Sequence, residues 1–154
     1  MTIESKVVGP LKPVEHDDEY FESAPFELPY FDNKKLTIGF IEARHQPYLD
    51  SADRVLTTFL TRNSNDRIND SGPVFTYYDQ TLKSGYTKDL GIKAPSEIWN
   101  YVTANEIIIL WDNNGDTYLC VSCACDWDIE HGLQLVFKNG QTLTGASGHG
   151  HFLD

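Results

Sequence analysis

Two stretches of sequence decide the fold: residues 106–124, EIIILWDNNGDTYLCVSCA, and residues 133–143, LQLVFKNGQTL. In the first, β-branched and aromatic runs flank the polar segment 112–116, which is typical of two strands joined by a turn. In the second, Asn139-Gly140 separates two apolar runs and is a strong local signal for a tight hairpin. Together these stretches predict a four-strand antiparallel meander.

A second antiparallel pair is predicted nearer the N-terminus. Residues 20–28 alternate roughly and contain Pro25, which lacks a backbone donor and therefore favours an edge strand. Residues 36–41 form a firmer strand beyond the turn at Asp32-Asn33. We expect these two segments to form an N-terminal hairpin.

Helices are predicted between the two groups of strands. Apolar residues in the segment 48–63 recur at helical spacing, with Asp50 or Ser51 as the N-cap. Residues 74–82 and 96–101 are expected to form two shorter helices. The fold class predicted is therefore α+β, in which a largely antiparallel sheet, made of an N-terminal hairpin and a C-terminal four-strand meander, packs on two or three helices. With 154 residues, the chain is expected to be a single domain, residues 1–154.

Charge excludes some classes of partner. The chain holds 12 Lys and Arg against 23 Asp and Glu, a formal net charge of −11, and residues 94–137 contain no Lys or Arg. A surface that binds nucleic acid needs cations to displace counterions from phosphates, so we predict no nucleic-acid partner. An acidic surface favours encounter with a basic protein. No apolar stretch of membrane-spanning length occurs, so we predict a cytoplasmic protein with no membrane partner.

The densest group of chemically active residues is CACDWDIEHG at residues 123–132, the link between the two C-terminal hairpins. We predict that it forms part of a surface that binds a partner, with the indole as the central anchor. The alternative is a structural corner, in which the indole packs and the carboxylates cap backbone donors. The predicted partner-binding residues are Asp126, Trp127, Asp128, Glu130 and His131.

A rival interpretation is a small metal-dependent or Cys/His hydrolase that uses Cys125, Glu130 and His131. An acidic neighbourhood raises the pKa of a thiol, which opposes a nucleophilic Cys125. Cys120 is expected on the opposite face of its strand from Cys123 and Cys125, and the spacing matches no zinc-binding motif. We therefore predict no metal site, no catalytic residue and no cofactor.

Two further features leave alternatives open. A structural module of a larger assembly could use its sheet edge or Trp99 and Trp111 as contacts. His149 and His151, which flank Gly150, are expected to lie in a solvated segment, where they could chelate an adventitious metal.

The segment from Cys125 to Leu133 reads C-x-W-D-x-E-H-G-L and is followed by an apolar strand and Lys138-Asn139-Gly140. This pattern resembles the C-terminal signature of a bacterial group of uncharacterised small α+β domains. The resemblance implies an α+β fold, and some members of the group look like immunity proteins encoded near toxins. The function predicted is therefore that of a non-enzymatic cytosolic binding protein, an immunity protein that neutralises a basic toxin.

Overall fold

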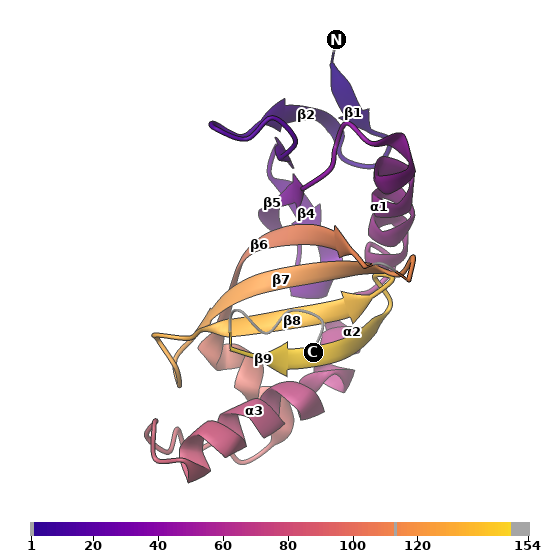
Figure 1. The fold of residues 1–154 in the computed structure, drawn as a ribbon. Helices are drawn as coiled ribbons and strands as arrows, with labels where there is room; N and C mark the ends of the chain where they lie inside the picture. The colour runs from indigo at the N-terminus through magenta and orange to yellow at the C-terminus, as the bar shows by residue number, and fades with distance from the viewer. Residues whose placement is uncertain (1, 113, 149–154) are drawn as a thin grey trace.

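The computed structural model describes residues 2–112 and 114–148, and within them nine strands form one mixed sheet (Figure 1). The strand order is β1-β2-β3-β5-β6-β7-β8-β9, and β4 pairs with the first half of β5. The strands are β1 (Ile3–Ser5), β2 (Gly9–Pro13), β3 (Phe21–Ser23), β4 (Phe26–Leu28), β5 (Lys34–Phe40), β6 (Val102–Trp111), β7 (Thr117–Cys125), β8 (Leu133–Lys138) and β9 (Thr142–Ser147). The helices are α1 (Gln46–Phe59), α2 (Ser64–Asn69), α3 (Ser71–Lys83) and the 3₁₀ helices η1 (Pro29–Phe31) and η2 (Pro95–Tyr101). The predicted α+β class is confirmed.

The C-terminal meander is confirmed, since β6, β7, β8 and β9 pair in sequence and antiparallel. The turn between β8 and β9 has positive φ at both Asn139 (54°) and Gly140 (72°), as a tight hairpin requires. A Cβ atom at Gly140 would lie 2.3 Å from the carbonyl oxygen of Val55 in α1. Glycine is therefore needed both for the turn and for its close approach to the helix.

The N-terminal strands differ in part from the prediction. β3 and β4 both pair antiparallel with β5, as expected for residues 20–28 and 36–41. However, β3 is not an edge strand, because β2 pairs with its other side and β1 pairs with β2. Pro25 lies in the break between β3 and β4, where its missing donor interrupts no ladder bond.

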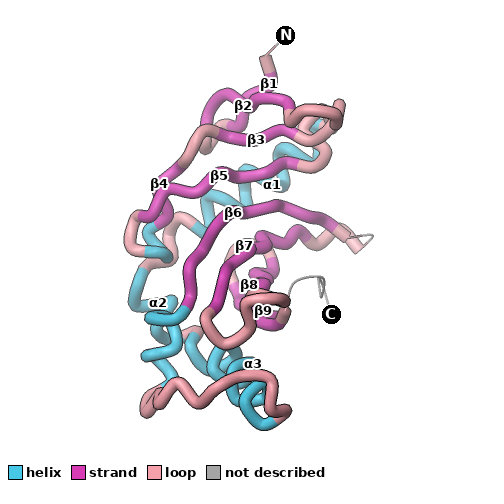
Figure 2. The backbone as a smooth tube through the Cα atoms, turned by 90° about the vertical axis from the view of Figure 1, so that its left-hand side faces the viewer, coloured by secondary structure: helices cyan, strands magenta, loops and turns pink. Residues whose placement is uncertain are grey.

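The two antiparallel groups are joined by a parallel pair that sequence reasoning missed. Residues 37–40 of β5 run alongside residues 106–109 of β6. The chain between these strands, residues 41–101, holds α1, α2, α3 and η2 and returns to the same sheet (Figure 2). Pairing between segments so far apart leaves no local pattern in the sequence, so the meander and the hairpin were predicted and their junction was not.

The first helix begins earlier than predicted and also ends earlier. α1 starts at Gln46 with Pro47 in its first turn, where proline costs no hydrogen bond. The predicted caps Asp50 and Ser51 are therefore wrong, because both lie inside the helix. α1 buries its apolar stripe and packs against β7. In Figure 2 it lies behind the sheet, beside β5.

A separate short helix, α2, begins where the first helix was predicted to end. The side chain of Asn63 caps α2 by accepting two backbone N–H bonds of its first turn. α3 begins at Ser71, ahead of the predicted 74–82, because Pro73 fits the first turn of a helix. The predicted helix at 96–101 is the 3₁₀ helix η2. α3 lies against β9 and η2 at the lower end of the molecule (Figure 1).

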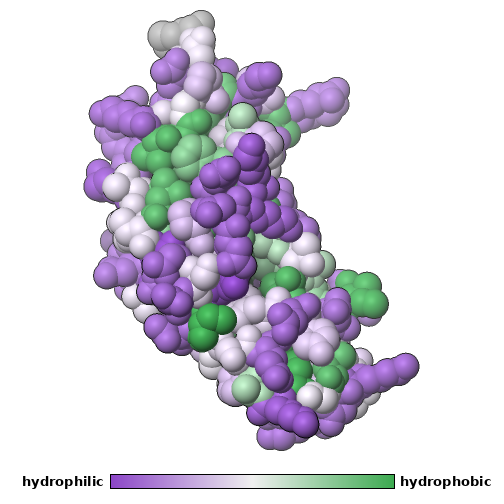
Figure 3. Space-filling model, turned by 180° about the vertical axis from the view of Figure 1, so that it is seen from behind, coloured by the Kyte–Doolittle hydropathy of each residue, from purple (hydrophilic) through white to green (hydrophobic). Residues whose placement is uncertain are grey.

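On the face opposite that of Figure 1, hydrophilic side chains dominate and the apolar areas are separate from one another (Figure 3). Among the described helices, none is both long and apolar enough to span a bilayer. Trp99 and Trp111, the suggested assembly contacts, are half-buried, and their indole N–H groups donate to Ser71 and Glu42. His149 and His151 lie outside the described residues.

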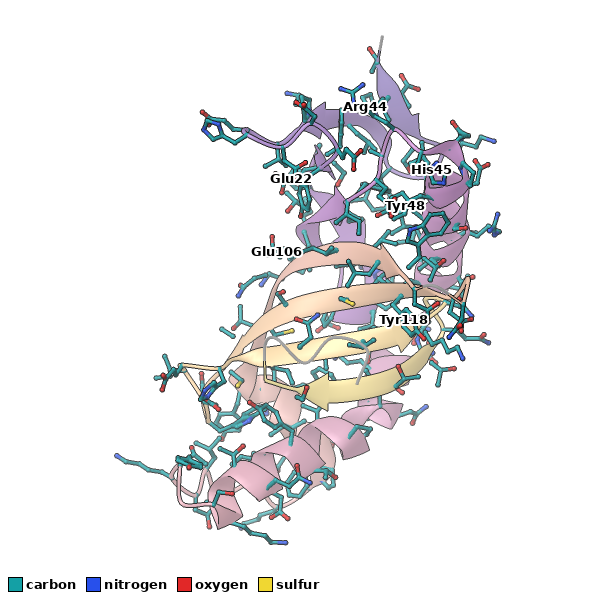
Figure 4. All side chains as sticks on the ribbon, viewed as in Figure 1. Glu22, Arg44, His45, Tyr48, Glu106 and Tyr118 are labelled. Carbon is teal, nitrogen blue, oxygen red and sulfur yellow. The ribbon has the colours of Figure 1, made fainter. Side chains whose placement is uncertain are left out.

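Tyr48 links α1 to both strands of the parallel pair. It extends from α1 toward the sheet (Figure 4) and is fully buried. Its hydroxyl donates to the carbonyl oxygen of Ile109 at 2.6 Å and accepts the backbone N–H of Ile41 at 3.0 Å. One side chain thus pairs a buried carbonyl group of β6 with a partly buried N–H group just after β5.

We expect Tyr48→Phe to lower the free energy of unfolding by about 1–3 kcal/mol, because the buried carbonyl of Ile109 and the partly buried N–H of Ile41 both lose this partner. The measurement is urea denaturation followed by tryptophan fluorescence. Tyr118→Phe is the control, since that hydroxyl lies 3.3 Å from one Asp112 carboxylate oxygen near the surface. Equal losses in the two variants would contradict the role of Tyr48 at the junction.

Candidate functional site

The predicted site residues lie in the loop between β7 and β8, residues 126–132. This loop comes next to the segment that follows α3, and residues of both line a groove of about 510 Å³. The two segments lie on the left side of Figure 1, at the end of the molecule where α3 ends. Residues far apart in the sequence therefore share one surface.

Trp127 is not available as a surface anchor. Its side chain is 1% exposed and packs between the rings of Tyr77 and Tyr78, with centroids 5.8 Å from each. The prediction of an exposed indole is wrong because α3 covers the ring, and burial of so large an apolar surface is strongly favourable. Trp127 instead holds the loop against α3, which is the packing role of the structural alternative.

Asp128 and His131 form an oriented pair within the loop. The Asp128 carboxylate accepts the backbone N–H of His131 at 2.9 Å and lies 3.1 Å from its ring Nδ1. The Tyr77 hydroxyl is 3.3 Å from the same carboxylate. Burial raises the pKa of Asp128, but the hydrogen bonds from His131 outweigh it and hold this pKa below its ordinary value. A charged Asp128 therefore fixes the imidazole, whose side chain is 65% exposed.

The most exposed large apolar side chains border the same loop. Ile129 is 91% exposed and Tyr86, in the segment after α3, is 84% exposed, and both line the 510 Å³ groove. The predicted residues Asp126 and Glu130 are exposed beside them. Sequence reasoning missed Ile129 and Tyr86, although an aliphatic residue between charged neighbours in the loop, as in DWDIEHG, was a usable signal for Ile129.

A second hollow lies on the other side of the loop. It has a volume of about 390 Å³ and is lined by α3 residues together with His131 and Gly148. Tyr86, Asp128 and Glu130 border both hollows. Ile129 lines only the larger of the two hollows, and His131 lines only the smaller one.

Cys125 lacks the arrangement that a Cys/His hydrolase requires. Its thiol is 3% exposed and donates to the carbonyl oxygen of Asp128, with Sγ and oxygen 3.6 Å apart. Burial raises the pKa of the Cys125 thiol to about 12, so at neutral pH the group is protonated and a poor nucleophile. Among residues 2–112 and 114–148, no group of three or more His, Cys, Asp and Glu side chains could hold a metal ion.

Alkylation tests whether the three cysteine thiols are buried in the folded protein. Burial raises the pKa of Cys120 to about 12 and raises that of Cys123 as well. With the Cys125 thiol near 12 too, we expect all three thiols to resist iodoacetamide at pH 8 in the native protein. All three should react in guanidinium, which returns them to ordinary thiol reactivity. Rapid native labelling of Cys125, read by mass spectrometry of the peptides, would revive the hydrolase interpretation.

The sequence was also compared with known proteins. A family model described as "Domain of unknown function (DUF6985)" matches residues 10–152. Neither the curated proteins nor the solved structures include a significant match. Because the family model covers most of the sequence, the chain belongs to this family of domains of unknown function.

Proposed function

We propose that this protein is a non-enzymatic domain that binds a basic protein through the surface formed by Tyr86, Asp126, Ile129 and Glu130, called the loop surface below. The observation that carries the proposal is the exposure of Ile129 (91%) and Tyr86 (84%) along one groove. Soluble proteins seldom leave two such side chains together in water, and exposed apolar groups inside a polar rim are typical of protein contact sites. Ile129 and Tyr86 take the anchoring role that the sequence assigned to Trp127.

Charge indicates the kind of partner. Three carboxylates line the groove, those of Asp126, Asp128 and Glu130, against the single ammonium of Lys88. The net charge of the chain, −11, has the same sign. A negative field of this kind accelerates encounter with a positively charged partner and repels an acidic one. The partner that fits is a basic protein with an apolar residue at the centre of its contact surface.

The finer proposal is that the partner is a toxin and that this protein is its cytoplasmic immunity protein. It is supported by the acidic charge of the chain and by the resemblance of the segment from Cys125 to Leu133 to domains that look like immunity proteins. An immunity protein acts by occupying its toxin, so it needs a contact surface and no catalytic group of its own.

The test compares two surface variants as baits in a lysate of the native host. Tyr86→Ser with Ile129→Ser removes the apolar pair of the loop surface. Ile68→Ser is the matched control, because Ile68 is the remaining exposed large apolar residue of the described chain, at 43%. We expect one basic protein to be retained by the wild type and the control and lost by the double variant. Its dissociation constant should rise at least about 30-fold in the double variant, equivalent to about 2 kcal/mol.

Two further measurements test the chemistry and the role of the captured partner. Added salt should slow association with the wild type, and less so with Asp126→Asn/Glu130→Gln, because exposed charges are screened. If the partner is a toxin, its expression alone stops growth, and co-expression of the wild type but not of the Tyr86/Ile129 variant restores it. A partner bound equally well by the double variant would refute the loop surface.

A further inference from the structure

The 390 Å³ hollow has two walls that come from distant parts of the sequence. The C-terminal half of α3 and the residues just after it form one wall, and the loop between β7 and β8 forms the other. The Tyr77 hydroxyl of α3 joins them, because it donates to the carbonyl oxygen of Gly132 at 2.9 Å and lies 3.3 Å from an Asp128 carboxylate oxygen. These contacts hold the two walls of the hollow together.

The wall formed by α3 offers mainly acceptors of hydrogen bonds. Thr81 and Ser84 line the hollow, and each hydroxyl donates at 2.9 Å to the carbonyl oxygen of the residue four positions earlier. Their hydroxyl hydrogens are therefore already used inside the helix, and only the lone pairs of the oxygens remain for a ligand. Gln80, which is exposed between them, adds an amide whose oxygen also accepts.

The wall formed by the loop adds negative charge and a further acceptor. The carboxylates of Asp128 and Glu130 line the hollow, and among its described lining residues there is no Lys or Arg. Both carboxylate oxygens of Asp128 lie 3.1 Å from Nδ1 of His131. In the neutral imidazole this bond places the hydrogen on Nδ1, so Nε2 carries the free lone pair. The hollow is therefore negative and rich in acceptors on both walls.

A ligand that matches this lining carries positive charge and several N–H donors. The arginine guanidinium has five N–H donors in a planar fork, which pairs with carboxylates and stacks on aromatic rings. Tyr86, which is 84% exposed, borders the hollow and offers such a ring. The lysine ammonium carries three donors on one compact charge, so it fits a set of separated acceptors less well. The lining therefore favours a guanidinium over an ammonium.

We propose that the 390 Å³ hollow receives an arginine side chain of the basic partner, whose guanidinium pairs with the Glu130 carboxylate and donates to Nε2 of His131. This inference rests on the proposed function and names the residue that the partner has to present at this place. Tyr86, Asp128 and Glu130 border both the hollow and the 510 Å³ groove. The arginine and the apolar contact residue of the partner therefore lie next to each other. Arginine is among the residues that most often anchor protein contacts.

The test uses N-acetyl-L-arginine amide as the probe, titrated into the ¹⁵N-labelled full chain and followed by two-dimensional NMR. We expect saturable shifts of the backbone amides of Gln80 and His131, one from each wall. The citrulline analogue has nearly the same shape but a neutral ureido group. It should bind at least about tenfold more weakly, because it cannot form charge-assisted hydrogen bonds with the carboxylates. The affinity of the lysine analogue should lie between the two.

Two pairs of variants locate the probe. Gln80→Lys places a positive charge on the wall formed by α3 and should weaken probe binding at least about tenfold, because it repels the guanidinium. Thr76→Lys is the matched control, since it adds the same charge at an exposed position of α3 that does not line the hollow. Glu130→Gln should weaken binding about fivefold, whereas Asp126→Asn should change it less than about twofold. Asp126 carries the same charge in the same loop but lines only the 510 Å³ groove.

Ile129→Ser separates this inference from the proposed function, because Ile129 lines the 510 Å³ groove and not the hollow. It should bind the probe as the wild type does. With the partner captured from the lysate, Gln80→Lys should weaken binding and Thr76→Lys should not. The inference is overturned if the citrulline analogue binds as tightly as the arginine probe, if the shifts map away from the hollow, or if Gln80→Lys binds the probe or the partner as tightly as Thr76→Lys. A lysate that yields no basic protein refutes the proposed function instead, while the probe still reports on the hollow.

Discussion

The parallel pairing of β5 with β6 is the contact on which the rest of the structure depends. Residues 37–40 and 106–109 alone join the N-terminal strands to the C-terminal meander within the sheet. On the side of α1, the Tyr48 hydroxyl forms hydrogen bonds with backbone groups at the end of this pair. The ring of Tyr20 lies against Gly39 of β5. Gly39 makes room for Tyr20, because a Cβ atom at Gly39 would lie 2.1 Å from the Tyr20 hydroxyl. Burial and the nearby carboxylates of Glu106 and Glu22, which are labelled in Figure 4, raise the pKa of Tyr20 to about 12, so the Tyr20 hydroxyl stays uncharged.

The exposed residues of the loop between β7 and β8 are held in place by buried residues next to them in the sequence. Trp127 and Cys125 are held in the core at the end of β7, which fixes the backbone on both sides of Asp126. Asp128 then turns the chain by accepting the backbone N–H of His131, and Tyr77 donates to the carbonyl oxygen of Gly132. A loop fixed in this way presents Ile129 without the entropy cost of ordering a mobile segment on binding. The buried tryptophan therefore fixes the position of the loop and contributes no exposed surface of its own.

The sequence predicted the local parts of the fold well and the candidate site much less completely. The meander and its Asn139-Gly140 turn were predictable because a tight hairpin depends on adjacent residues. The parallel pair was not, because its strands meet only after residues 41–101 have folded back. In the loop, charge and position in the chain indicated Asp126, Asp128, Glu130 and His131 as neighbours. Residue type alone does not say whether a side chain is exposed. The indole of Trp127 was therefore predicted on the surface, although α3 covers it. Tyr86 was missed because the loop residues that share its groove come from a distant part of the sequence.

The three cysteines set how the protein responds to oxidants. Cys120, Cys123 and Cys125 are all buried, and the first faces the opposite side of β7 from the other two. Oxidation to sulfenic acid starts from an accessible thiolate, and a disulfide needs two thiols that can meet. The first condition is not met by any of the three buried thiols, and Cys120 faces away from the other two, so peroxide should leave the fold intact. The surfaces that this fold supports, the loop between β7 and β8 among them, should therefore keep their shape during oxidative stress.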